Sequence, residues 1–120
     1  MKQMVNNPVP GNLKISEEVI SAIVTQAAVE VEGVYGLADI PISMKEYILL
    51  AKKPRAIKIA MNGGTAGITV GLCLRSGYKI KRIAEQVQQE VKAAVQSMTG
   101  VTVSKVNIYV AGVKNEQRSV

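Results

Sequence analysis

The sequence predicts an α+β fold of two layers, in which two main helices cover one face of a mostly antiparallel sheet of three to four strands. Two long segments repeat apolar residues at spacings of three and four, which is typical of amphipathic helices. Several shorter segments alternate apolar with polar residues, as strands with one buried and one wet face do. The chain has 120 residues, 48% of them apolar, so we expect one domain around a single aliphatic core.

The first regular elements are expected near the N-terminus. Leu13 and Ile15 alternate with polar neighbours and predict a short edge strand. Ser16 stands at the N-cap position of a helix that we expect over 17–32, because Gly33 is a typical C-terminal stop. The residues that give this segment its helical spacing are Val19, Ile20, Ile23, Val24, Ala27, Ala28 and Val31.

The stretch from 34 to 55 has the weakest pattern of the chain. Met44, Ile48 and Ala51 share one face of a possible helix, whereas the run 48–50 equally fits a short strand. We therefore expect a short helix or an irregular excursion between the flanking regular elements.

A hairpin and a long helix are expected next. Residues 57–61 and 68–74 alternate in strand fashion, and the Asn-Gly-Gly signal at 62–64 predicts the turn between them. Apolar residues then recur at helical spacing from Ile80 until Gly100 closes the helix.

The last strand changes parity. Val101 and Val103 have odd residue numbers. Val106, Ile108 and Val110 have even numbers, and one strand cannot place both sets on one face. A bulge near 104–105 resolves the conflict. The expected order is therefore β-α-(excursion)-β-β-α-β.

The predicted domain spans 12–113, with a flexible N-terminal arm over 1–11 and a flexible tail over 114–120. The N-terminal arm lacks the apolar stretch of a signal peptide. No apolar run approaches the ~20 residues that cross a bilayer, so we expect any membrane association to be peripheral.

The composition argues against an enzyme. The chain has no His and a single Cys, Cys73, which removes the commonest general base and any multi-Cys metal site. The acidic residues form no set that converges with a nucleophile and a base. We therefore expect no catalytic residues, no metal and no cofactor, and we expect Cys73 to fill the polar face of its strand.

A net charge of +6 favours acidic partners. Strand alternation places a candidate partner surface on the open face of the sheet: Lys58, Arg75, Lys105, Asn107 and Tyr109. Such a face suits an acidic protein or the phosphates of RNA or DNA, and a merely solvated basic surface is the alternative. Tyr109 is the one aromatic residue predicted there for stacking on bases.

Two other segments are candidates for contacts. A candidate membrane or partner segment combines apolar residues with two lysines: Met44, Ile48, Leu49, Lys52 and Lys53. Because this segment is short for an interfacial helix, we favour the interpretation that 48–50 covers one end of the core. Ala22 and Val29 lie on the outward side of the first helix and are candidates for self-association, unless the excursion over 34–55 folds back and covers them.

Three stretches carry a resemblance to a known family: Ile15–Ile20, Glu30–Gly36 and Val87–Val113. They resemble the alkaline shock protein family of envelope stress proteins in Gram-positive-type bacteria, and the similarity extends over Leu13–Val113. The resemblance implies a cytoplasmic, membrane-proximal protein without enzymatic activity, recruited by small membrane-anchor proteins and able to self-assemble. The segment 39–53 departs from the family, whose members often have a Gly-rich loop there.

These observations predict a non-enzymatic scaffold or adaptor linked to envelope stress and homeostasis. We expect it to act through protein–protein contacts at the inner face of the cell membrane. The alternative is an RNA- or DNA-binding module that uses the basic sheet face.

Overall fold

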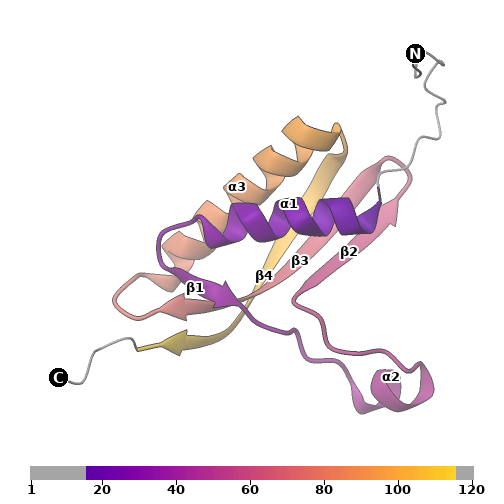
Figure 1. The fold of residues 1–120 in the computed structure, drawn as a ribbon, viewed down its shortest axis with the longest axis horizontal. Coiled ribbons are helices and arrows are strands. Elements are labelled where there is room, and N and C mark those ends of the chain that lie inside the picture. Colours follow the sequence, from indigo (N-terminus) through magenta and orange to yellow (C-terminus); the bar gives the residue numbers. More distant parts are fainter. Residues whose placement is uncertain (1–15, 116–120) are drawn as a thin grey trace, which may run out of the picture.

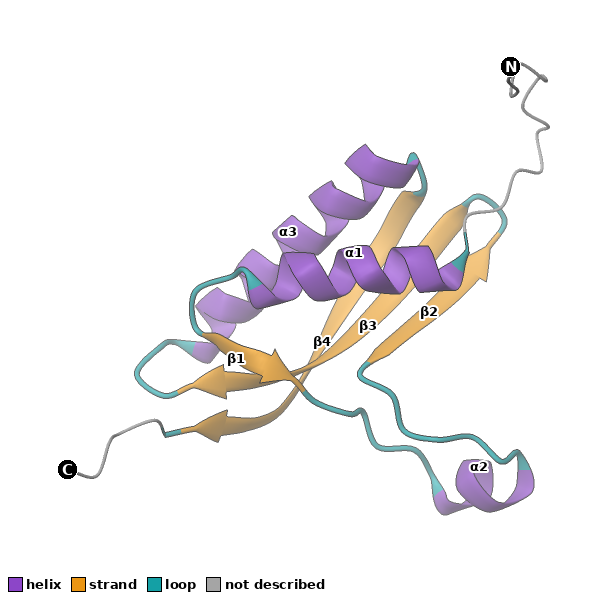
Figure 2. Cartoon of the chain, viewed as in Figure 1, coloured by secondary structure: helices purple, strands orange, loops and turns teal. Residues whose placement is uncertain are grey.

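The computed structural model describes residues 16–115, in which two long helices lie side by side on one face of a four-stranded sheet (Figure 1, Figure 2). The elements in chain order are α1 (Glu17–Val29), β1 (Val34–Leu37), α2 (Met44–Leu49), β2 (Ile57–Asn62), β3 (Thr65–Arg75), α3 (Ile80–Thr99) and β4 (Thr102–Lys114). The predicted α+β class and its two layers are confirmed.

Strand β3 is the centre of the sheet. Strand β4 pairs with it along its whole length, and the pairing is parallel because α3 carries the chain back between them. On the other edge, β2 pairs with 65–70 and β1 with 72–74, both antiparallel. Two of the three pairings are thus antiparallel, as expected, and the longest one is parallel.

Gly71 marks the point where one edge partner of β3 replaces the other. Its N–H donates to the carbonyl of Ala56 at 2.7 Å, just before β2, and its carbonyl accepts the N–H of Ala38 at 2.9 Å, just after β1. A Cβ at this position would overlap the Ala38 carbonyl oxygen and press on Ile40 at 3.0 Å. Only glycine allows this close approach of the backbone.

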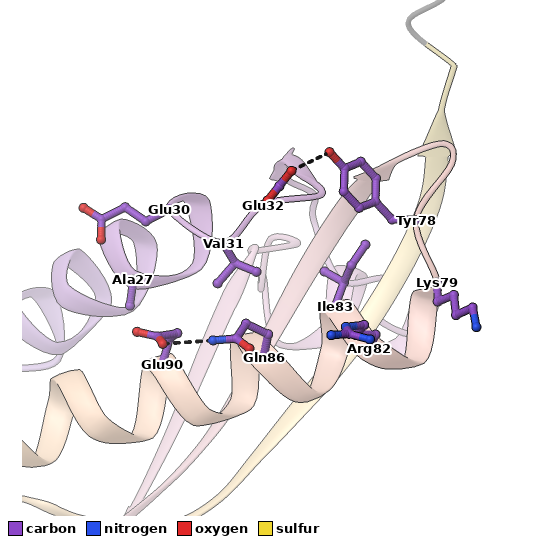
Figure 3. Close-up of a pocket in the computed structure, with 10 residues that line it drawn as sticks. All are labelled: Ala27, Glu30, Val31, Glu32, Tyr78, Lys79, Arg82, Ile83, Gln86 and Glu90. Atoms are coloured by element: carbon purple, nitrogen blue, oxygen red, sulfur yellow. Dashed lines mark hydrogen bonds between the residues drawn. The ribbon is translucent and has the colours of Figure 1, made fainter.

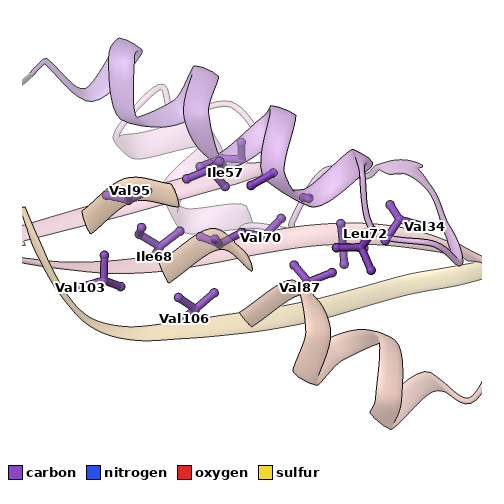
Figure 4. Close-up of a cluster of buried hydrophobic side chains, with 14 of the residues drawn as sticks. Val34, Ile57, Ile68, Val70, Leu72, Val87, Val95, Val103 and Val106 are labelled. Carbon is purple, nitrogen blue, oxygen red and sulfur yellow. The ribbon is translucent and has the colours of Figure 1, made fainter. Parts of the chain in front are cut away.

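The core lies between the sheet and the two long helices (Figure 4). Strand β3 buries every second residue, as alternation requires. Helices α1 and α3 close the layer with aliphatic side chains, and no aromatic residue belongs to the buried cluster. The fully buried members from these three elements include Ile20, Val24, Ile68, Val70, Leu72, Val87, Val91 and Val95.

The predicted helices and hairpin are present with shifted ends. Helix α1 begins after its Ser16 cap as predicted but ends at Val29, and Gly33 follows with a φ of 101°. The hairpin turn is shorter than predicted, because pairing continues to Asn62 and Thr65. Helix α3 ends at Thr99, and Gly100 closes it in the left-handed conformation, as predicted.

The strand irregularities are partly as predicted. Val103 pairs with Ala66 and Lys105 with Gly67, so Ser104 is the extra residue of the expected bulge. A second register shift leaves Ala111 extra, and this one was not predicted. Strand β1 was also missed, because its four residues include a glycine and show no clean alternation.

Several predictions concern residues outside 16–115. The edge strand at 13–15, the arm over 1–11 and residues 116–120 of the predicted tail lie beyond the described part of the chain, while Lys114 is the last residue of β4. Across the described residues, none of the helices combines the length and the apolar character needed to span a membrane.

Candidate interaction site

Residues 41–54, which we call the α2 arm, leave the sheet between β1 and β2 and project away from the two long helices (Figure 1). The arm is pinned at its base, where the N–H of Ile40 donates to the carbonyl of Arg55 at 2.8 Å. Ile40 is buried there against Gly71 of β3. The base therefore packs against the sheet, whereas α2 beyond it has no buried residue.

A capping box builds the short helix of the arm. The Ser43 Oγ accepts the N–H of Glu46 at 3.1 Å, and the Glu46 carboxylate accepts the N–H of Ser43 at 3.1 Å. The hydrogen bond from the Ser43 backbone, with weaker attraction from Lys52 and Lys58, lowers the pKa of Glu46 below its usual value. The helix stops where Ala51 adopts a positive φ of 52°.

The arm presents an apolar surface to solvent. No residue of α2 is buried. The large apolar side chains within 44–50 are 58% to 71% exposed. These residues are Met44, Tyr47, Ile48, Leu49 and Leu50. The expectation that 48–50 covers one end of the core is therefore wrong, because the pairing of Ile40 with Arg55 directs the arm away from it.

The arm and the open sheet face border a hollow of about 750 Å³. Basic side chains from three parts of the chain line it: Lys52, Lys53, Arg55, Lys58 and Lys105. Glu17 and Glu46 are its acidic members. The excess of cations gives this hollow a positive potential that attracts anionic groups.

The predicted partner surface is only partly contiguous. Lys58 and Asn107 both pair with Thr69, one on each side, and Asn107 Nδ2 donates to the Thr69 hydroxyl at 3.4 Å. Lys105 lies opposite Gly67 two residues away on the same face, and Tyr109 lies opposite Gly71. The sheet therefore brings these four predicted residues together beside the hollow.

Arg75 lies apart from them, at the far end of β3. Its guanidinium carbon is 5.6 Å from the centre of the Tyr35 ring, and Lys114 Nζ is 5.7 Å from the same ring. These are cation–π contacts. The prediction that Tyr109 is the one aromatic residue on this face is therefore wrong, because Tyr35 of the unpredicted β1 also lies there.

A second hollow, of about 530 Å³, lies between the C-terminal end of α1 and the start of α3 (Figure 3). The Tyr78 hydroxyl donates to the Glu32 carboxylate at 3.2 Å, and Gln86 donates to Glu90 at 3.0 Å. Lys79 and Arg82 add positive charge to the same rim. Its charges are mixed, and within residues 16–115 no group of three or more His, Cys, Asp or Glu side chains forms a potential metal site.

Comparison with known proteins places this fold in a family. A model of the alkaline shock protein 23 family, described by its cell envelope-related function, matches residues 6–115. The chain belongs to the alkaline shock protein 23 family. The match covers the sheet, both long helices and the α2 arm.

Relatives of this family member occur in Bacillus and Streptococcus. The uncharacterized protein YloU of Bacillus subtilis strain 168 is 33% identical over 107 residues, which cover 87% of this chain and 89% of YloU. The uncharacterized protein Spy1614 of Streptococcus pyogenes serotype M6 is 29% identical over 111 residues, covering 90% and 92% of the two chains. Among solved structures, a MamM-CTD variant aligns with a TM-score of 0.51 and 14% identity over 82% of this chain and 100% of that one, which shows a shared fold.

The outer side of α1 is open in this alkaline shock protein 23 family member. Ala22 and Val29 are exposed, as predicted for the self-association candidates, and Val19 is exposed beside them. The alternative that the 34–55 excursion folds back over this side is wrong, because the arm points elsewhere (Figure 2).

Tertiary pairing brings residues to the site that were not predicted to lie together. Lys53, predicted as part of the contact segment, and Arg55 join the hollow because Ile40 pairs with Arg55 at the base of the arm. Lys114 and Tyr35 reach the open face through the second bulge and through β1. A run of basic residues near 52–58 was the one signal of the hollow that the sequence carried.

Proposed function

We propose that this chain is a non-enzymatic adaptor in cell-envelope homeostasis, and that the α2 arm docks on a membrane-associated protein at the inner face of the cell membrane. One observation carries the proposal: the arm exposes Met44, Tyr47, Ile48, Leu49 and Leu50 together on a projecting element. The family's cell envelope-related function supports the setting.

The apolar surface of the arm is unfavourable in contact with water. Large contiguous apolar patches on a single chain mark interaction sites, because water contact disfavours them. Full burial of one side chain of this kind stabilises a complex by about 1.5–3 kcal/mol. A short helix held by a capping box presents these side chains in a fixed arrangement, which lowers the ordering cost of docking.

Basic residues of the arm support a membrane-proximal partner. Lys45, Lys52 and Lys53 are exposed beside the apolar cluster. Each contributes attraction to an anionic leaflet or to acidic residues of a protein near it. The apolar cluster then supplies affinity, and the lysines supply orientation.

Fractionation of the native cell tests this function. The double variant Ile48→Ser/Leu49→Ser should move from the envelope fraction to the soluble fraction and lose its crosslinked protein partner. Met98→Ser is the matched control, because Met98 is 69% exposed on α3, away from the arm. Unchanged fractionation of the double variant would refute docking through the arm. Binding of the wild type to protein-free anionic vesicles that the double variant loses would assign the arm to lipid instead.

A second function is favoured by the basic hollow. Five cations around one hollow, which Asn107 also lines, suit the phosphates of a single-stranded nucleic acid. Titration with single-stranded and duplex oligonucleotides at two salt concentrations tests it. Binding that weakens steeply with salt and is lost in Lys58→Gln/Lys105→Gln would support this function over the adaptor.

A further inference from the structure

Strand β4 has one free edge. It is 13 residues long, and β3 is its single strand partner among residues 16–115. An exposed edge presents unpaired N–H and C=O groups to any extended chain that approaches, so folded proteins usually protect it. How this edge is protected decides what it can bind.

Side chains of α3 protect the first half of the edge. The Gln96 side-chain oxygen accepts the N–H of Val103 at 3.0 Å. The Gln88 side-chain nitrogen donates to the carbonyl of Val106 at 2.9 Å. Both backbone groups therefore point away from β3, toward α3.

The second half of the edge has no such protection. Backbone groups of successive strand residues point to opposite edges. Because the Val106 carbonyl points outward, the N–H and C=O groups of Ile108 and Val110 point outward too. Within residues 16–115, no hydrogen bond from a side chain or another strand reaches these outward groups.

The far end of β4 supports this assignment. The carbonyl of Lys114 accepts the N–H of Ser76 at 3.0 Å, so Lys114 points toward β3. Strict alternation from Val106 would turn the backbone groups of Lys114 outward. The extra residue of the bulge, Ala111, shifts the alternation by one position, so that Lys114 faces β3. Val113 then points its backbone outward, and its side chain is 49% exposed.

The unprotected part of the β4 edge, from Ile108 to Val113, is the bare edge. The side chains on its two faces differ in chemistry. On the helix side lie the apolar side chains Ile108, Val110 and Val113, all at least partly exposed. On the open face lie Tyr109 and Lys114, with Arg75 of β3 next to Lys114 in the register. An added strand would therefore meet apolar groups with one row of side chains. With the other row it would meet Tyr109 and the cation Lys114, which has Arg75 of β3 behind it.

We infer that the bare edge of β4, from Ile108 to Val113, binds an extended segment of a protein partner that alternates apolar with acidic residues. The segment adds to the sheet as a fifth strand. This inference rests on the proposed function in so far as the chain acts through protein–protein contacts. It assigns a surface separate from the α2 arm.

Charge decides between such a segment and a second copy of the chain. Along the face of α3 that carries Gln88 and Gln96, helical spacing places Lys81, Lys92 and a single acid, Glu85. A second β4 would bring another set of cations to this positive edge, and the chain as a whole carries +6. Like charges across a strand pair are destabilising, whereas an acidic segment is attracted.

A synthetic peptide of about ten residues, the length of an ordinary strand, that alternates Val with Glu is the probe. In the labelled full chain, the amide hydrogens of Ile108 and Val110 should become protected from exchange on its addition. The Val110→Pro variant should bind about tenfold more weakly, because proline removes an outward N–H and blocks the approach of the added strand. No ladder hydrogen bond to β3 is lost, so the variant should fold.

Val110→Thr is the matched control, because it keeps the N–H and the branched shape, and its affinity should equal that of the wild type. A peptide with Lys in place of Glu should not bind. Equal binding by Val110→Pro, or protection at the edge of β2 instead, would overturn the inference. So would a wild-type dimer in sedimentation that Val110→Pro dissociates, since a second copy would then occupy the edge.

Two further results keep the test decisive. If Val110→Pro fails to fold, the exchange pattern of the wild type alone decides, because protection must appear at Ile108 and Val110. The arm variant Ile48→Ser/Leu49→Ser should bind the peptide normally. Failure of arm docking and failure of strand addition are therefore observed separately.

Discussion

Strand β3 and the α2 arm are built from the same aliphatic residue types, yet their side chains have opposite environments. Leu72 and Leu74 of β3 are buried, whereas Leu49 and Leu50 of the arm are exposed. Strand β3 has partners on both edges and helices over one face, while the arm is held at its base by the Ile40–Arg55 pair. Long-range pairing, rather than local hydrophobicity, decides which aliphatic residues form the core and which form a contact surface.

Truncation of one leucine in each region should give the largest difference in the free energy of unfolding. Leu72→Ala removes a fully buried side chain and should lower the free energy of unfolding by about 2–5 kcal/mol. Leu49→Ala removes a side chain that is 68% exposed and should change it by no more than about 0.5 kcal/mol. Urea unfolding followed by circular dichroism measures both.

The pair also tests the exposed arm itself. A loss in Leu49→Ala comparable to that in Leu72→Ala would mean that the arm packs on the body of the protein in solution. The apolar surface on which the proposed docking depends would then not be free.

A smaller effect is expected where the two regions meet. Gly71→Ala places a methyl group against the Ala38 carbonyl, so the backbone must shift, and the free energy of unfolding should fall by about 1–3 kcal/mol. In Gly67→Ala, the nearest atom is the flexible Lys105 Cε at 3.5 Å, an ordinary contact. That variant should be close to neutral, and equal losses in the two variants would contradict the close approach at Gly71.

The parts of the fold with strong periodicity could be predicted from the sequence. The alternation in 68–74 and the helical spacing after Ile80 each have one solution that buries the apolar residues, and the parity change before Val106 required a bulge. Strand β1 could not be predicted, because its four residues owe their strand conformation to pairing with 72–74 of β3.

The candidate site was less predictable, for a related reason. Alternation within a strand correctly placed Lys58, Lys105 and Asn107 on one face of the sheet. It could not indicate that Arg75 contacts Tyr35, because that contact depends on the register of β1. Nor could it indicate the exposure of 48–50, since periodicity identifies an apolar face but not the element that covers it.

Lowering the pH should have the smallest effect, a loss of helicity that is confined to α2 of the arm. The pKa of Glu46 is lowered chiefly by its hydrogen bond from the Ser43 backbone, so the carboxylate form favours the helix. This contribution is fully present above the unfolded-state pKa and is lost as the pH falls through the lower folded-state pKa. The helical chemical shifts of Tyr47 and Ile48 should therefore decline at acid pH, while those of α3 persist. Glu46→Gln, which does not titrate, should abolish the pH dependence of α2. If α2 and α3 instead lost helicity at one common pH, the arm would belong to the cooperative unit of the core, and the contrast between the two regions would fail.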